Sequence, residues 1–161
     1  MFISTHAYSA QVLGQRESET LPKFMQDLQH LRQLQAAWAN SKITQRTAQL
    51  LALAERIEAN KPELAAAMCM EVGRCLRECE AEIDKTVDLI RYYAKLAPEL
   101  LDSKTITTQA SLSQVRFEPL GVVLAVMPWN YPVWQIMRFA VPALCAGNAC
   151  LVKPAPSVAQ V

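Results

Sequence analysis

The chain has 161 residues, of which 52% are apolar, and a formal net charge of +1. This length suits one ordinary domain, and the near-neutral charge favours neither nucleic acid nor an anionic membrane as a partner. No apolar stretch is long and clean enough to span a bilayer, and the first residues lack the order of a secretory signal. The five cysteines form no CxxC pair. This argues against a zinc framework and a full set of disulfides, so we expect a reducing compartment, the cytoplasm.

The first two-thirds of the chain have the apolar spacing of helices. Residues 20–38 carry a rough helical stripe, and residues 44–59 carry a clearer one at the i, i+3, i+4, i+7 spacing. The clearer stripe consists of Leu50, Leu53, Ala54 and Ile57. Asn60 and Glu63 then resemble a capping box that begins a short third helix, which Gly73 is placed to end.

A longer helix follows, with an apolar stripe that we expect to face the core. The stripe consists of Cys79, Ile83, Val87, Ile90, Ala94 and Ala97. The acidic and basic residues between these positions are most simply a solvated face. Pro98 should stop the helix, because the residue before a proline avoids helical geometry.

The next segment has the pattern of two short strands. Lys104–Thr108 and Leu112–Glu118 are rich in Thr, Val and Ile, alternate in part, and are joined by a short polar connection. This predicts an antiparallel β-hairpin. Because a two-stranded hairpin is marginally stable by itself, this one is a candidate to pair with another chain.

From Gly121 the pattern becomes that of a βαβ unit. Val122–Val126 is apolar on both faces, like a buried strand of a parallel sheet, and Val133–Ala146 supplies a crossover helix. Ala149–Val152 is the second parallel strand, so the expected fold class is α/β. Two parallel strands without cover on one edge do not make a finished sheet, and the sequence looks cut rather than completed.

Polar residues follow both strands of this unit. Asn130 stands between two prolines in the segment Met127–Pro132, and Lys153 ends the second strand. The carboxyl ends of such strands are where open α/β sheets bind ligands, so these residues are expected to share one crevice. Simpler interpretations stay open: Asn130 as a turn residue, Lys153 as a solvated cation and Trp129 as a packing residue.

Four blocks of the sequence resemble the aldehyde dehydrogenase superfamily in order and spacing. The blocks are Glu118–Val123, Pro128–Pro132, Pro142–Asn148 and Leu151–Ala155. Upstream, Glu71–Arg74 and Arg91–Ala94 are similar to the helical region of that family, and the likeness runs from about Tyr8 to the end. The amino-acid sequence at Tyr131–Gln135 and Lys153–Pro156 resembles that of the bacterial succinate-semialdehyde dehydrogenase branch.

The resemblance implies an enzyme that oxidises an aldehyde to an acid. In the family a cysteine thiolate attacks the carbonyl carbon, NAD or NADP accepts a hydride, and water hydrolyses the thioester. Asn130 matches the asparagine that donates to the developing oxyanion, and Lys153 matches the lysine that reaches the adenosine ribose. The cofactor-binding residues that the resemblance implies are Met127, Pro128, Trp129, Lys153, Pro154, Ala155 and Pro156.

Two positions depart from the family pattern. Pro156 stands where many relatives have a glutamate that bonds the ribose hydroxyls and repels a phosphate. We therefore predict that NADP is tolerated as well as NAD. Arg138 precedes Phe139, which stands where many relatives have a lysine. Arg138 is either a partner for a substrate carboxylate, which would suit succinate semialdehyde, or a member of a structural ion pair.

In the family, the nucleophilic cysteine and the general-base glutamate lie well beyond position 161, and Cys145 and Cys150 are interpreted as packing residues. The resemblance implies a helical part of the cofactor-binding domain over 1–103 and an oligomerisation arm over 104–119. Residues 120–161 would begin a truncated Rossmann-like NAD(P)-binding domain. We expect the N-terminal portion of a homo-oligomeric dehydrogenase, inactive alone.

Three other hypotheses are open. The chain would be a non-catalytic interaction module if it paired with full-length dehydrogenase subunits through its hairpin. It would be an inert product of a broken gene if it were unstable and degraded. A helical adaptor unrelated to dehydrogenases leaves the four matching blocks unexplained.

Overall fold

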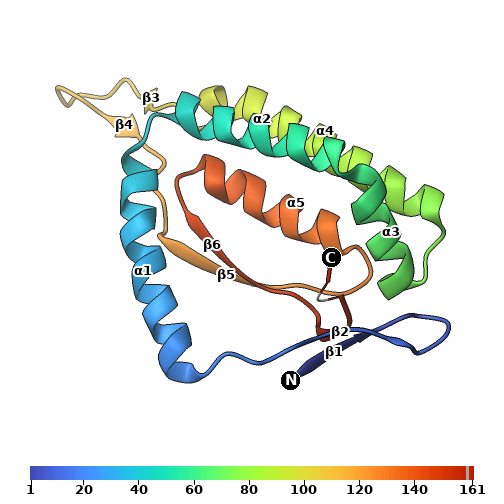
Figure 1. The fold of residues 1–161 in the computed structure, drawn as a ribbon. Helices are drawn as coiled ribbons and strands as arrows, with labels where there is room; N and C mark the ends of the chain where they lie inside the picture. The colour runs from blue at the N-terminus through green and yellow to red at the C-terminus, as the bar shows by residue number, and fades with distance from the viewer. Residues whose placement is uncertain (159) are drawn as a thin grey trace.

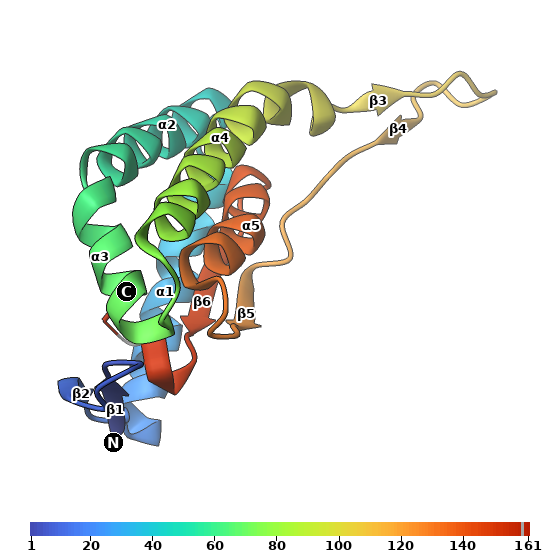
Figure 2. The same cartoon turned by 90° about the vertical axis from the view of Figure 1, so that its right-hand side faces the viewer.

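The computed structural model describes residues 1–158 and 160–161 (Figure 1). In chain order the elements are β1 (Phe2–Thr5), β2 (Val12–Arg16), α1 (Leu21–Asn40), α2 (Ile43–Ala59), α3 (Lys61–Val72), α4 (Leu76–Leu100), β3 (Lys104–Thr105), β4 (Gln114–Val115), β5 (Val122–Val126), α5 (Pro132–Cys145), β6 (Ala149–Lys153) and the 3-10 turn η1 (Pro156–Val158). Helices α2 and α4 pack side by side, and α5 lies between this pair and the β5–β6 sheet (Figures 1 and 2). The fold is therefore mixed α/β, as predicted.

The core forms where α2, α4 and α5 meet, with α3 closing one end. Every member of the predicted stripe on α4 is buried, which confirms the prediction of a helix with one apolar face in that segment. On α2, Leu50, Ala54 and Ile57 are buried and Leu53 is half-buried. Burial of each large aliphatic side chain contributes about 1.5–3 kcal/mol, so this contact surface is the main source of stability.

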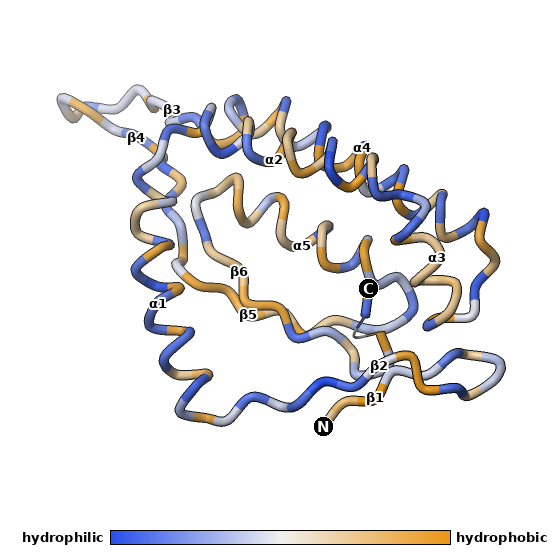
Figure 3. The backbone as a smooth tube through the Cα atoms, in the orientation of Figure 1, coloured by the Kyte–Doolittle hydropathy of each residue, from blue (hydrophilic) through white to orange (hydrophobic). Residues whose placement is uncertain are grey.

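The predicted βαβ unit is confirmed. Strands β5 and β6 pair in parallel, with Val122 opposite Ala149 and Val126 opposite Lys153, and α5 makes the crossover between them. Apart from Lys153 at the end of β6, both strands are hydrophobic (Figure 3). The expectation that β5 is buried on both faces is wrong, because α5 covers only one face: Leu124 is 59% exposed and Val126 67% exposed.

The predicted hairpin exists but is shorter than expected. Only Lys104–Thr105 and Gln114–Val115 pair as strands, and one further bond joins the Ile106 N–H to the Ser113 carbonyl oxygen at 2.9 Å. The hairpin projects away from the helices (Figure 2). Its paired residues are all exposed, so no packing against the body extends the ladder.

One expected helix cap and one expected helix end are wrong, although α3 begins directly after Asn60 as predicted. The Asn60 side chain donates to the Arg56 carbonyl oxygen at 2.7 Å, so it stays with α2 and forms no capping box with Glu63. Helix α4 continues past Pro98 to Leu100, because a proline in the last turn removes only one backbone bond. Gly73 does end α3, in the left-handed conformation at φ 79°.

The N-terminal hairpin of β1 and β2 was not predicted from the sequence. It packs on α3 and η1, and the Ala7 N–H donates to the Met70 carbonyl oxygen at 2.8 Å. Buried Ser4 bonds the buried Glu71 carboxylate, which also accepts the backbone N–H groups of Gln160 and Val161 at 3.0 Å each. Within the described part of the chain, no helix is both long and apolar enough to cross a membrane.

Candidate functional site

The carboxyl ends of β5 and β6 lie side by side. Val126 is opposite Lys153 in the ladder, and the Met127 N–H donates to the Lys153 carbonyl oxygen at 3.0 Å. The turn that leads from β5 into α5 holds Trp129, which is 56% exposed, and Asn130, which is also exposed. The structure thus places the predicted turn and the predicted lysine at adjoining strand ends.

Glu82 of α4 caps the N-terminus of α5. One carboxylate oxygen accepts the backbone N–H groups of Val133 at 3.1 Å and Trp134 at 2.9 Å. Pro132 occupies the first turn, where a missing N–H costs nothing. A carboxylate at this end also opposes the positive pole of the helix dipole. The start of α5 is therefore fixed by a side chain from another helix.

Arg74 pairs with Glu82 and contacts the turn directly. Its Nη1 lies 2.5 Å from the Glu82 carboxylate and 3.4 Å from the Asn130 carbonyl oxygen. Its guanidinium carbon lies 4.1 Å from the centre of the Tyr131 ring, a cation–π distance. Burial opposes the charge of Arg74, but the hydrogen bond and the charge of Glu82 outweigh it and raise the Arg74 pKa.

The C-terminal end of α5 is held by donors from α1 and α2. Arg46 Nε donates to the Cys145 carbonyl oxygen at 3.0 Å, and its Nη1 donates to the Ser41 carbonyl oxygen at 2.5 Å. Trp38 Nε1 donates to the Leu144 carbonyl oxygen at 2.9 Å. The bonds to Leu144 and Cys145 satisfy last-turn carbonyl oxygens of α5 that have no partner within the helix, whereas Ser41 follows α1.

Asn148 joins the two strand starts to this end of α5. Its side-chain oxygen accepts the N–H groups of Leu120 at 2.7 Å and Gly121 at 3.1 Å, while its nitrogen donates to the Ala143 carbonyl oxygen at 3.1 Å. Asn148 is buried. The block Ala146–Asn148, which resembles the family pattern, is thus a structural link at the end of the βαβ unit away from the candidate site.

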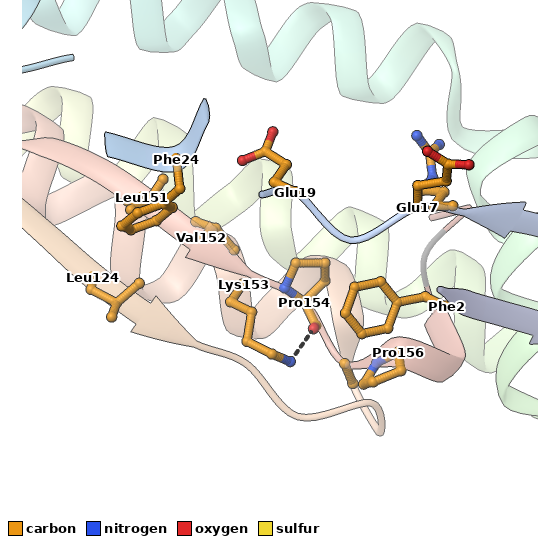
Figure 4. Close-up of a pocket in the computed structure, with 12 residues that line it drawn as sticks. Phe2, Glu17, Glu19, Phe24, Leu124, Leu151, Val152, Lys153, Pro154 and Pro156 are labelled. Carbon is orange, nitrogen blue, oxygen red and sulfur yellow. Dashed lines mark hydrogen bonds between the residues drawn. The ribbon is translucent and has the colours of Figure 1, made fainter. Parts of the chain in front are cut away.

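The predicted cofactor residues other than Trp129 line two hollows. The first, of about 430 Å³, is lined on one side by the segment from Lys153 to Pro156 and on the other by side chains from the β1–β2 hairpin and α1 (Figure 4). Lys153 Nζ donates to the Pro154 carbonyl oxygen at 2.9 Å and lies 5.9 Å from the centre of the Phe2 ring. The second hollow, of about 350 Å³, is lined in part by Met127, Pro128 and Pro154.

Arg138 lies within α5, and its side chain is exposed. Among the described residues no ion pair of Arg138 is found. The structural alternative for this residue is therefore without support, and the substrate alternative stays a prediction.

The cysteines divide by environment. Cys79 and Cys145 are buried and Cys150 is half-buried, and burial raises the pKa of all three thiols. This suits packing residues and opposes the thiolate form that a nucleophile needs. Cys75, in contrast, is exposed. No cluster of metal-ligand type is found within the described ranges.

Sequence reasoning missed Glu82, which it assigned to the solvated face of α4. The side chain is fully buried. A signal was available: Glu82 and Thr86 occupy the i+3 and i+7 positions relative to Cys79, which belong to the apolar stripe. A carboxylate at such a position indicates a buried charge with a partner, although its partners Val133 and Trp134 are distant in sequence and give no local sign.

An α/β fold with its candidate residues at the carboxyl ends of parallel strands has the arrangement of a ligand-binding α/β protein. The particular family follows from comparison with known proteins. The model of the aldehyde dehydrogenase family matches residues 3–161, so the chain belongs to that family.

Three known proteins illustrate the similarity. The chain is 47% identical over 107 residues to a probable NADP-dependent succinate-semialdehyde dehydrogenase of Synechocystis, covering 66% of this chain and 24% of the relative. It is 33% identical over 160 residues to the NAD(P)-dependent succinate semialdehyde dehydrogenase of Escherichia coli, covering 96% and 35%. The crystal structure of succinic semialdehyde dehydrogenase from Streptococcus pyogenes with NADP matches with a TM-score of 0.92 at 28% identity, covering 98% and 35%.

Proposed function

We propose that this chain supplies the oxyanion donor and part of the nucleotide cleft of an NAD(P)-dependent aldehyde dehydrogenase acting on succinate semialdehyde. The observation that carries the proposal is the juxtaposition of the Asn130 turn and Lys153 at the adjoining ends of β5 and β6. Membership of the aldehyde dehydrogenase family and the names of the relatives give the reaction and the substrate class.

Asn130 is proposed to donate its side-chain amide to the aldehyde oxygen as negative charge develops there. The residue is exposed in the turn between β5 and α5, and its backbone oxygen accepts a hydrogen bond from Arg74 at 3.4 Å. A donor that is fixed before the reaction needs no reorganisation in the transition state, and loss of one such donor typically costs about 2.7–4 kcal/mol of barrier.

A nicotinamide dinucleotide fits the residues at the strand ends. Lys153 offers an exposed ammonium beside a hollow of about 430 Å³, which suits ribose hydroxyls or a 2′-phosphate. The residues proposed to hold it are Met127, Pro128, Trp129, Lys153, Pro154, Ala155 and Pro156. When bound, the nicotinamide accepts the hydride from the substrate.

Use of both NAD and NADP is proposed because of Pro156. A proline carries no charge to repel a 2′-phosphate, and relatives of this chain are named as NADP-dependent or NAD(P)-dependent enzymes. Arg138 is proposed as the partner of the substrate carboxylate, supported by its exposure and by the absence of an ion pair within the described residues.

The nucleophile is proposed to lie outside this chain. Burial raises the pKa of Cys79, Cys145 and Cys150, which supports this assignment. The 161 residues alone are then expected to show no turnover. We assign residues 1–103 and 120–161 to the nucleotide-binding domain and 104–119 to an oligomerisation arm, because the hairpin projects from the body with exposed paired residues.

The proposal is tested in a chimera in which this chain replaces the matching 35% of the Escherichia coli enzyme. Asn130→Ala should lower kcat for succinate semialdehyde roughly 100- to 1,000-fold. Asn60→Ala, which removes an exposed amide bonded to its own helix, is the matched control and should leave kcat unchanged. An Asn130→Ala chimera as active as the control would refute the role of Asn130.

A second candidate function, a non-catalytic interaction module, is favoured by the same projecting hairpin. Co-expression with an intact dehydrogenase distinguishes the two. Stable co-purification that is lost when 104–119 is deleted supports the module, whereas co-purification unaffected by the deletion contradicts it.

A further inference from the structure

Glu82 is a charged residue at a place where an apolar one would pack. Its side chain is fully buried on the stripe of α4 that faces the core. An unpaired charge in such a place is strongly destabilising, and a well-packed apolar residue of similar volume often serves stability at least as well as an ion pair. Its contacts therefore indicate what a charged residue does at this position.

All of these contacts converge on the segment that contains Asn130. Glu82 accepts the N–H groups of Val133 and Trp134, and its other oxygen pairs with Arg74. Arg74 in turn donates to the Asn130 carbonyl oxygen and lies over the Tyr131 ring. Arg74 also donates to the Glu78 carbonyl oxygen at 3.1 Å and lies 3.6 Å from the Glu78 carboxylate. Glu82 and Arg74 together thus contact both the turn and the first turn of α5.

We infer that Arg74 and Glu82 are positioning residues that set the direction of the Asn130 side chain. This inference rests on the proposed function of Asn130. The peptide between Asn130 and Tyr131 is contacted from its carbonyl side, and the helix start is held from its N–H side. These contacts restrain the backbone that carries the Asn130 side chain on its C-terminal side.

A role in stability alone is a weaker account. Helix α5 is already anchored at its other end by Arg46 and Trp38, which do not contact the turn. Arg74 also reaches past Glu82 to a backbone oxygen in an exposed turn, where hydrogen bonding to water was available. Its side chain is only 17% exposed, so it gives up solvation to make this contact.

The first test uses the 161-residue chain and nuclear magnetic resonance. Arg74→Gln should shift the side-chain amide signals of Asn130 and speed amide exchange at Val133 and Trp134, and Arg74→Lys should restore them in part. The control Arg91→Gln breaks an exposed pair between Arg91 of α4 and Glu58 of α2 and should change neither. Unchanged Asn130 signals in Arg74→Gln would overturn the inference.

The second test measures kinetics in the chimera with the Escherichia coli enzyme, where the same variants are compared. A displaced donor lowers kcat with little change in KM, and a displacement of about 1 Å is enough for a loss of roughly 100-fold. Arg74→Gln should therefore act on kcat, Arg74→Lys should recover part of it, and Arg91→Gln should have no effect.

The outcomes separate the two proposals. A loss of kcat in Asn130→Ala without one in Arg74→Gln or Glu82→Gln leaves the proposed function standing and overturns the positioning role. Full activity in Asn130→Ala refutes the proposed function itself. If Arg74→Gln lowered both kcat and the midpoint of thermal unfolding, and Arg74→Lys restored neither, the ion pair would be purely structural. That result would also overturn the inference.

Discussion

The two ends of α5 are held by opposite charges that come from different helices. At the N-terminal end, Glu82 of α4 accepts two backbone N–H groups, and at the C-terminal end Arg46 of α2 donates to the Cys145 carbonyl oxygen. Each charge opposes the pole of the helix dipole that it faces. The same physics therefore acts twice, once beside the candidate site and once remote from it.

The difference lies in what balances each charge. Arg46 bonds four carbonyl oxygens, of Trp38, Ala39, Ser41 and Cys145. Glu82 carries a counter-ion, Arg74, which extends the contact into the turn of Asn130. The C-terminal end is thus a device for stability, whereas the N-terminal end couples stability to the geometry of the turn.

The largest effect is expected from breaking the ion pair on one side only. Arg74→Leu leaves the Glu82 carboxylate buried without its partner, and such a change typically costs about 3–5 kcal/mol of stability. Chemical denaturation of the chain measures this loss. Arg74→Leu combined with Glu82→Gln should recover part of it, since the uncompensated charge is gone; a double variant no more stable than Arg74→Leu contradicts the buried-charge explanation.

At the other end of α5, Arg46→Leu should cost about 2–3 kcal/mol, because the buried Cys145 carbonyl oxygen and the partly buried Ser41 carbonyl oxygen lose their donor. In the chimera this variant should lower the midpoint of thermal unfolding while kcat of the folded enzyme stays unchanged. A loss of kcat in the folded Arg46→Leu chimera would contradict the view that the C-terminal end of α5 affects stability alone.

Glu82 and Arg46 also show what the sequence could and could not predict. The stripe of α4 and the order strand, helix, strand after Gly121 follow from local periodicity, so both were predicted and confirmed. The partners of Glu82 lie 51 and 52 residues away, and Arg46 reaches Cys145 across 99 residues. Periodicity marks which face is buried, but it does not say which distant backbone group will meet a charge there.

The N-terminal hairpin was missed for a different reason. Its strands have only 4 and 5 residues, and the register shifts between Ser4 and Thr5. Neither strand alternates apolar and polar residues or forms a continuous apolar run, so the pattern gives no strand signal. The hairpin is held by contacts with α3 and η1. Its position became visible only with the tertiary structure, although it helps to line the hollow beside Lys153.

A smaller effect is expected at Asn148, the link between α5 and the start of β5. Asn148→Ala removes the acceptor for the Leu120 and Gly121 N–H groups, which should cost about 1–3 kcal/mol. Amide exchange should accelerate at Gly121 more than at Val133, because the damage lies at the end of the unit remote from Glu82. Equal acceleration at both residues would mean that the two ends of α5 do not behave independently.

The smallest effect concerns pH and the core at the C-terminal end of α5. Burial raises the pKa of the Cys145 thiol, whereas unfolded thiols ionise near 8.5. Above that pH the folded chain binds more protons than the unfolded chain, so stability, fully present at lower pH, falls as pH rises toward the raised value. The slope for one thiol is at most about 1.4 kcal/mol per pH unit. Denaturation of Cys145→Ala and the unaltered chain between pH 8 and 10 measures it: the variant should show the shallower decline, and parallel curves would exclude this thiol as the cause.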